Sequence, residues 1–217
     1  GNTGNEVIFL EKSSAFTVEF SADLHRRLPI EESFDCVSTV FDLKQGQGEL
    51  IFIDGFAKDE VMEKIMEHMM KLDPLAEASI SGWLARQIPY LEVEGTTDLA
   101  KAVDAVLSGT LLFLAEGAQE AVLIDARSYP VRSMQEPEDD RVLRGSRDAF
   151  VETLIFNTAL IRRRIRDPKL IYEYVQVGSR SKTDVVLCYL SDKVDRKLLE
   201  KVRTKLNDTE VDGLSLS

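Results

Sequence analysis

A charged stretch without apolar periodicity, MQEPEDD at residues 134–140, divides the chain into two parts. Segments of this composition, here including Pro137, typically connect domains instead of contributing to a core. Because one core commonly holds about 100 to 200 residues, a chain of 217 residues has room for two small subdomains. We therefore expect a partly disordered N-terminal extension at residues 1–33, a first subdomain at 34–133, a linker at 134–145 and a second subdomain at 146–217 that is truncated at its C-terminus.

The first part has the pattern of strands, then helices, then strands. Two β-branched and aromatic runs, FDCVSTVFDL and GELIFIDGF, flank a turn that contains Gly46 and Gly48, and this predicts a β-hairpin. Apolar residues at helical spacing then predict helices at residues 58–72, 80–88 and 98–107. Strand-like runs follow at residues 110–116, 120–126 and 128–133.

The second part begins with a long predicted helix from Ser146 to about residue 166. Strands at residues 170–177 and 183–190, a helix at 196–206 and the beginning of a further strand in DGLSLS complete it. The order of elements predicts the α/β (α+β) fold class, with two small subdomains that each consist of a mixed β-sheet packed with helices.

Charge is distributed unevenly along this acidic chain. The formal net charge is −11, but residues 1–125 hold 9 Lys and Arg against 23 Asp and Glu, whereas residues 126–217 hold 18 against 15. The overall charge argues against general nucleic-acid binding, which requires a basic surface to neutralise phosphates. Opposite charge could attract the two halves to each other, within one chain or between copies, where their surfaces approach within about 8 Å.

Four arginines lie at the end of the long predicted helix, at positions 162, 163, 164 and 166. Cations in a last helical turn complement the helix dipole, and this structural role would explain them without any ligand. Successive helical residues differ by about 100°, so the three consecutive arginines spread over about 200° and cannot all reach one small anion. Phosphate or lipid headgroups and an acidic protein surface, such as the first half of another copy, remain as functional interpretations. The candidate interaction residues are Arg162, Arg163, Arg164, Arg166, Arg144, Arg147, Arg180 and Lys182.

The sequence predicts no catalytic, metal or cofactor site. His25 and His68 are the only histidines, and no HExxH, CxxC or GxSxG spacing occurs. The loop GSRSKTD lacks the glycine that a phosphate-binding loop places before its lysine, so we interpret it as a hairpin loop with a basic tip. Two cysteines are too few for a disulfide framework and favour a reducing compartment. We also find neither a signal peptide nor a run of about 18 apolar residues that could span a membrane.

Two segments carry a resemblance to a known family. They are SGTLLFLAEG and the longer AVLIDARSYPVRSMQEPEDDRVLRGSRDAFVETLIFNTALIRRRIRDPKL, in which Tyr129-Pro130, Glu136-Pro137 and Arg144-Gly145-Ser146-Arg147 occur in order. Together they resemble the extramembranous N-terminal region of the A subunits of Ger-type spore germination receptors, from about Phe34 to Tyr189.

The resemblance implies a soluble region of two α/β parts that precedes transmembrane helices absent from this chain. It implies a place at the spore inner membrane, facing the cytoplasm, and partners that are other copies of the protein and other germination membrane proteins. We expect a non-enzymatic domain without cofactors, acting in assembly and signalling of a germination receptor or ion-channel complex. The basic second subdomain of one copy could dock on the acidic first subdomain of the next. The alternative is a domain that binds a small-molecule nutrient germinant between its subdomains, with the linker near Pro137 as hinge.

Overall fold

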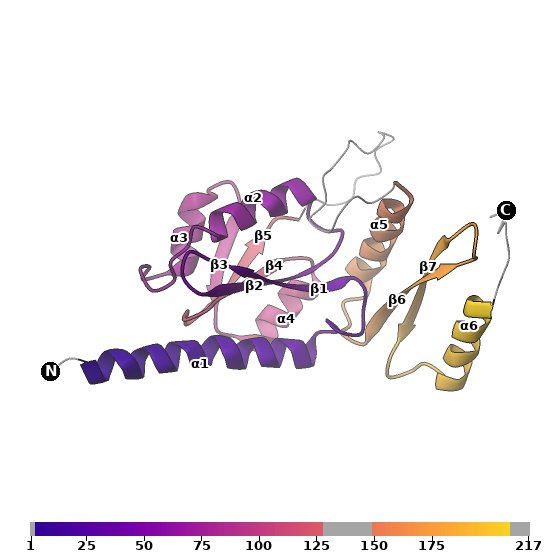
Figure 1. Ribbon diagram of the computed structural model, residues 1–217, viewed down its shortest axis with the longest axis horizontal. Helices are drawn as coiled ribbons and strands as arrows, with labels where there is room; N and C mark the ends of the chain where they lie inside the picture. The colour runs from indigo at the N-terminus through magenta and orange to yellow at the C-terminus, as the bar shows by residue number, and fades with distance from the viewer. Residues whose placement is uncertain (1–2, 128–148, 209–217) are drawn as a thin grey trace.

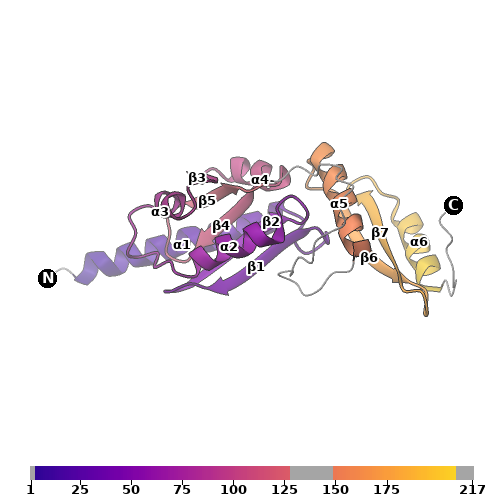
Figure 2. The ribbon, with the colours of Figure 1, turned by 90° about the horizontal axis from the view of Figure 1, so that it is seen from above.

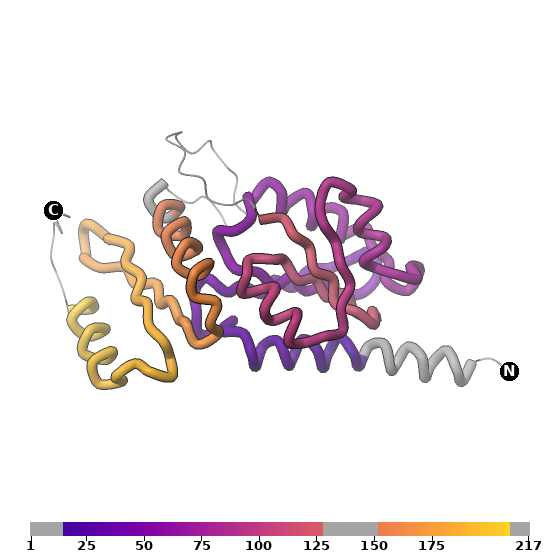
Figure 3. Tube along the Cα trace, turned by 180° about the vertical axis from the view of Figure 1, so that it is seen from behind, coloured from indigo at the N-terminus to yellow at the C-terminus, as the bar shows by residue number. Residues whose placement is uncertain are grey.

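The computed structural model describes residues 3–127 and 149–208, with side chains from residue 15 onward and, after the gap, from residue 152 onward. Figure 1 shows two unequal subdomains arranged along the longest axis. Helix α5 lies between the larger first subdomain and the hairpin of the second, and the views from above and from behind agree on this placement (Figures 2 and 3).

The first subdomain is an antiparallel sheet with strand order β1-β2-β4-β5-β3. Its strands are β1 (Cys36–Asp42), β2 (Gln47–Ile53), β3 (Glu92–Thr96), β4 (Leu111–Ala115) and β5 (Ala121–Asp125). Its helices are α1 (Thr3–Arg27), α2 (Asp59–Met69), α3 (Ile80–Gln87) and α4 (Leu99–Leu107). Among the described strands, β1 pairs only with β2 and lies at one edge of this sheet.

Both faces of this sheet are covered by helices. Successive residues of β2 alternate between the faces, as strand geometry requires. Leu50 and Phe52 pack in one core cluster with residues of α2 and α3, whereas Ile51 and Ile53 pack in a second cluster with residues of α1 and α4. The first subdomain is therefore a three-layer arrangement of helices, sheet and helices.

Helix α1 corrects the expected N-terminal extension. Phe20, Leu24 and Leu28 are buried in the second core cluster, and the rings of Phe16 and Phe20 stack with their centroids 5.2 Å apart. The second half of the segment expected to be a partly disordered extension, residues 1–33, thus belongs to the core of the first subdomain.

The second subdomain consists of α5 (Ala149–Arg164), the antiparallel hairpin of β6 (Leu170–Val177) and β7 (Thr183–Leu190), and α6 (Arg196–Asp208). Tyr172 faces α5 and its hydroxyl donates to the carbonyl of Thr158, 2.9 Å away. Glu173, on the opposite face of β6, pairs with Arg203 of α6. The two helices therefore sandwich the hairpin.

The expected α+β class is confirmed, with one correction: each sheet is antiparallel throughout and not mixed. The predicted hairpin, the helices at 58–72, 80–88, 98–107 and 196–206 and the strands at 110–116, 120–126, 170–177 and 183–190 all occur, with ends shifted by a few residues. The predicted strand at 128–133, the linker at 134–145 and the strand beginning in DGLSLS lie outside the described residues.

Candidate functional site

Arg162, in the last turn of α5, is fully buried at the junction of the two subdomains, with 0% of its side chain exposed. Its Nε and Nη2 donate to the two carboxylate oxygens of Asp35, each at 2.9 Å. Nη2 also donates to Ser33 Oγ at 3.3 Å and to the carbonyl of Leu170 at 2.9 Å, and Nη1 donates to the carbonyl of Asp167 at 3.1 Å. One guanidinium therefore joins the segment before β1 to the turn between α5 and β6.

Tyr172 and Ser33 complete this junction. The guanidinium carbon of Arg162 lies 5.1 Å from the centre of the Tyr172 ring, within the range of a cation–π contact. Ser33 Oγ donates to Asp35 at 2.6 Å and accepts from the backbone N–H of Tyr172 at 2.9 Å, while the N–H of Phe34 donates to the Tyr172 carbonyl at 2.8 Å. Burial raises the pKa of the Tyr172 hydroxyl above its usual value, so this group stays a neutral donor.

The junction fixes the orientation of the subdomains and does not present a binding site. A buried ion pair is tolerated only where further hydrogen bonds satisfy its remaining polar atoms. Among the described residues, every buried side-chain nitrogen and oxygen has a hydrogen-bond partner. Because Asp35 and backbone carbonyls already use the Arg162 donors, this arginine has no role in an interaction surface, which corrects its inclusion among the candidate interaction residues.

The other candidate interaction residues lie apart from one another. Arg163, Arg164 and Arg166 are exposed at the end of α5, where Arg166 Nε donates to the carbonyl of Arg163 at 3.4 Å. Arg180 and Lys182 are exposed in the turn between β6 and β7. Arg144 and Arg147 fall outside the described residues. The described positions therefore form two separate basic surfaces, one at the end of α5 and one at the hairpin tip.

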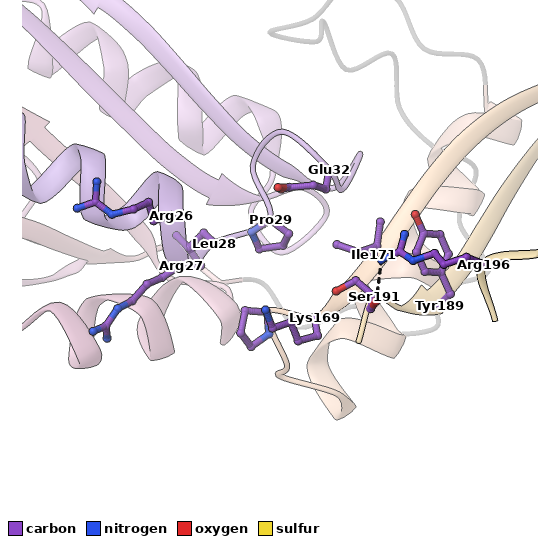
Figure 4. Close-up of a pocket in the computed structure, with 11 residues that line it drawn as sticks. Arg26, Arg27, Leu28, Pro29, Glu32, Lys169, Ile171, Tyr189, Ser191 and Arg196 are labelled. Atoms are coloured by element: carbon purple, nitrogen blue, oxygen red, sulfur yellow. Dashed lines mark hydrogen bonds between the residues drawn. The ribbon is translucent and has the colours of Figure 1, made fainter. Parts of the chain in front are cut away.

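A cleft of about 280 Å³ lies beside the junction, between the end of α1 and the second subdomain. Of the described residues, Arg26, Arg27, Lys169 and Arg196 line it together with one acidic residue, Glu32. Figure 4 shows that Arg26 and Arg27 extend away from the wall formed by the second subdomain, and that Arg196 turns toward the Ser191 carbonyl, to which it donates at 2.8 Å. The cations of this cleft do not converge on one point.

A second depression, of about 530 Å³, runs between α1 and the β1–β2 edge of the sheet, and we call it the α1 groove. It is lined by Thr17, Val18, Ser21, Ala22, His25, Val40, Gln47, Gly48, Glu49, Leu114 and Glu116. Glu49 accepts from Ser21 Oγ at 2.6 Å and Ser38 Oγ at 2.5 Å and pairs with His25 Nε2 at 2.7 Å. Burial alone would raise the pKa of Glu49, but these three partners together hold it below its usual value.

Replacing Glu49 by glutamine is expected to make the stability of the protein less dependent on pH in the acidic range. A carboxyl group whose pKa is lower in the folded chain than in the unfolded chain, where it is about 4.3, stabilises the fold above that pH. This contribution is lost as the pH falls through the folded value. Urea unfolding from about pH 7 to about pH 3 should show the difference in unfolding free energy between wild type and Glu49→Gln shrinking toward low pH. A difference that stays constant over this range would contradict the role of Glu49.

No group of three or more His, Cys, Asp and Glu side chains that could hold a metal ion occurs in the part of the chain that the structure describes. Within residues 3–127 and 149–208, no helix has the length and apolar character needed to span a membrane. Cys36 is buried, and burial raises the pKa of its thiol to about 12, so it is not an activated nucleophile.

Residues 24–217 match the model of the Bacillus/Clostridium GerA spore germination protein family. The chain belongs to the GerA family. Stage V sporulation protein AF of Bacillus subtilis (strain 168) is 34% identical over 193 residues, which are 88% of this chain and 39% of that protein. Spore germination protein KA of the same organism is 28% identical over 172 residues, or 76% of this chain and 31% of that protein. The chain thus spans well under half the length of these relatives.

A solved structure has the same fold. The N-terminal domain of the A subunit of the Bacillus megaterium spore germinant receptor GerK3 superposes with a TM-score of 0.59 at 19% identity, covering 89% of this chain and 70% of that one. At this identity the likeness shows the fold alone. It agrees with the resemblance that the sequence carries, to the N-terminal region of germination receptor A subunits.

The sequence patterns did not predict that Asp35 and Ser33 are the buried side-chain partners of Arg162. Asp35 interrupts the apolar run that begins at Phe34 and leads into β1, and an acidic residue within such a run is a signal for a buried charge that needs a partner. The pattern does not say which arginine supplies the partner, because Arg162 is 127 positions further along the chain.

Proposed function

We propose that this GerA-family domain acts in assembly and signalling of a spore germination membrane complex, without catalysing a reaction. In the whole protein it would lie at the spore inner membrane on the cytoplasmic side, in contact with other copies of itself and with other germination membrane proteins. The observation that carries this proposal is the difference in exposure within the arginine run: Arg162 is buried in contacts inside the chain, whereas Arg163 and Arg164 are exposed.

A second observation supports a signalling role. The two subdomains are joined by a buried, fully hydrogen-bonded ion pair and not by a linker alone. A partner that contacts one subdomain would therefore move the other with it, because changing their relative orientation breaks the bidentate contact between Arg162 and Asp35. Such coupling suits a domain that passes a change in one protein of a complex to its neighbours.

Reversing the charge at Arg163 and Arg164 is expected to weaken self-association of the full-length protein. Charge reversal at a complementary interface replaces attraction with repulsion toward the acidic first subdomain, and the effect should diminish at high salt. Sedimentation velocity of detergent-solubilised protein measures the change, with the double charge reversal of Arg180 and Lys182 at the hairpin tip as a matched control. Unchanged assembly of the Arg163→Glu, Arg164→Glu variant would count against the proposed function.

The alternative, binding of a small-molecule germinant between the subdomains, has the cleft beside the junction as its candidate site. Its volume is about 280 Å³, and its cations point in different directions, so they do not form a single binding point for a small anionic ligand. The geometry therefore favours assembly over ligand binding. Isothermal titration with amino acids and sugars separates the two functions, because only a receptor domain exchanges binding heat with such ligands.

A further inference from the structure

The end of α5 carries an exposed apolar and basic surface, which we call the α5 patch. It consists of Ile161, Arg164 and Ile165, whose spacing of three and four residues places them on one face of the helix. Ile161 is 40% exposed and Ile165 is 43% exposed, and Arg164 is also exposed. The side chain of Arg164 makes no hydrogen bond or ion pair to any described residue. Two exposed isoleucines beside a cation without a partner are typical of a protein contact surface.

The α1 groove has the opposite character. Val18 and Val40, on its two walls, are 68% and 58% exposed. Glu116 is exposed at its end and accepts only a neutral backbone N–H, that of Gln47, at 2.8 Å among the described contacts. None of the described residues that line the groove is a lysine or an arginine. The groove is therefore apolar along its walls and acidic at Glu116 and Glu49.

We propose that the α5 patch of one copy is seated in the α1 groove of a second copy. This inference rests on the proposed function in assembly and names the surfaces that would make the contact. Ile161 and Ile165 would bury their exposed area against Val18 and Val40, and Arg164 would pair with Glu116. The patch and the groove are both apolar and carry opposite charges. The opposite charges favour the alignment in which Arg164 lies next to Glu116 over other alignments of the two surfaces.

The arrangement of the two surfaces requires an intermolecular contact. The groove belongs to the β1–β2 edge of the first subdomain, whereas the patch lies at the end of α5, which the Arg162 ion pair holds in place. A contact between two different surfaces of identical copies is heterologous, and repetition of such a contact produces a ring when the rotation between copies closes. The groove, at about 530 Å³, is large enough to receive several side chains of a neighbour.

Cysteine cross-linking in the full-length protein tests this contact. In a Cys188→Ser background, Val40→Cys is combined with Ile165→Cys, because a disulfide forms only where the two Cα atoms come within about 7 Å. The matched control combines Ile165→Cys with Tyr90→Cys, because Tyr90 is 64% exposed and precedes β3, the edge strand opposite to β1. We expect oxidation to give a ladder of linked copies for positions 40 and 165, and no ladder for positions 90 and 165. The single-cysteine variants should give dimers at most.

A second variant measures the strength of the contact. Ile165→Asp is expected to weaken self-association on the order of tenfold, because it places a carboxylate against the acidic groove. Equal cross-linking of both cysteine pairs, or linkage of the Val40→Cys variant to a different protein, would overturn the proposed contact. Unchanged association of Ile165→Asp in a protein that still assembles would overturn this contact and leave the assembly function standing. A full-length protein that does not self-associate at all would overturn both.

Discussion

Replacing Arg162 by alanine is expected to lower the free energy of unfolding by about 3 to 5 kcal/mol, because Asp35 would remain as a buried charge without its partner. The substitution also removes the donors to the carbonyls of Asp167 and Leu170 and the contact with the Tyr172 ring. Urea unfolding followed by circular dichroism measures the loss. Arg164→Ala, two residues further along the same helix, is the matched control and should change the stability by no more than about 0.5 kcal/mol, because its side chain is exposed.

The double replacement Asp35→Leu, Arg162→Met separates the contribution of the ion pair to stability from the contribution of the packing around it. Removing both charges leaves no uncompensated carboxylate, so apolar residues of similar size should recover most of the stability that Arg162→Ala loses. We expect the double variant to fold but to hold its subdomains in a less defined orientation, which small-angle scattering would record as a broader distribution of distances. A loss below about 1 kcal/mol in Arg162→Ala would contradict the assignment of Arg162 to a buried junction.

Strong local patterns account for the elements that the sequence predicted correctly. The hairpin of β1 and β2 combines two β-branched and aromatic runs with Gly46, which has a φ of 74° in the turn. Helix α4 has Asp98 as its N-cap, accepting from the N–H of Lys101 at 3.2 Å, and Gly109 follows its end. In such elements turn chemistry, capping and apolar period all predict the same structure.

Elements with weak local patterns were missed. Helix α1 ends at Arg27, and its buried residues Phe20 and Leu24 form, with Leu28 just after its end, a single row four residues apart. Polar residues between them, such as Ser21 and Asp23, keep this row from forming a broad apolar stripe. Strand β3 has the sequence EVEGT, in which two glutamates and Gly95 disfavour a strand. It forms because it pairs with β5 at the sheet edge, a contact more than 20 residues away in sequence.

The candidate site shows the same division between local and long-range information. Helical geometry correctly predicts that the consecutive arginines cannot all face one surface. It does not predict that Arg162 is the one that turns inward, because that choice depends on Asp35 and Ser33 in the other subdomain. Charge counts along the chain likewise indicate an acidic first half without locating the α1 groove, which forms only when α1 packs across β2.

Replacing Gly55 by alanine is expected to destabilise the protein by about 3 kcal/mol, through backbone strain and crowding together. Gly55 follows β2 with a φ of 101°, a conformation that residues with a side chain rarely adopt. A Cβ atom there would lie 2.9 Å from the Cβ of Ala159 and 3.1 Å from the carbonyl oxygen of Ile155, both in α5. The alanine would therefore push α5 away from the first subdomain, at the same junction that Arg162 holds together. Thermal unfolding checks the size of the effect.

Gly117→Ala is the control that separates strain from crowding. Gly117 also has a positive φ, 85°, but its nearest atom to an added Cβ is a flexible leucine methyl group at 3.4 Å, an ordinary contact. We expect Gly117→Ala to lower the free energy of unfolding by about 1 kcal/mol, through backbone strain alone. If Gly55→Ala proves no more destabilising than Gly117→Ala, α5 is not packed against the first subdomain as described. If Gly55→Ala is the more destabilising of the two, the double variant Gly55→Ala, Arg162→Ala should lose less stability than the sum of the two single losses. The reason is that each substitution disrupts the same contact between α5 and the first subdomain.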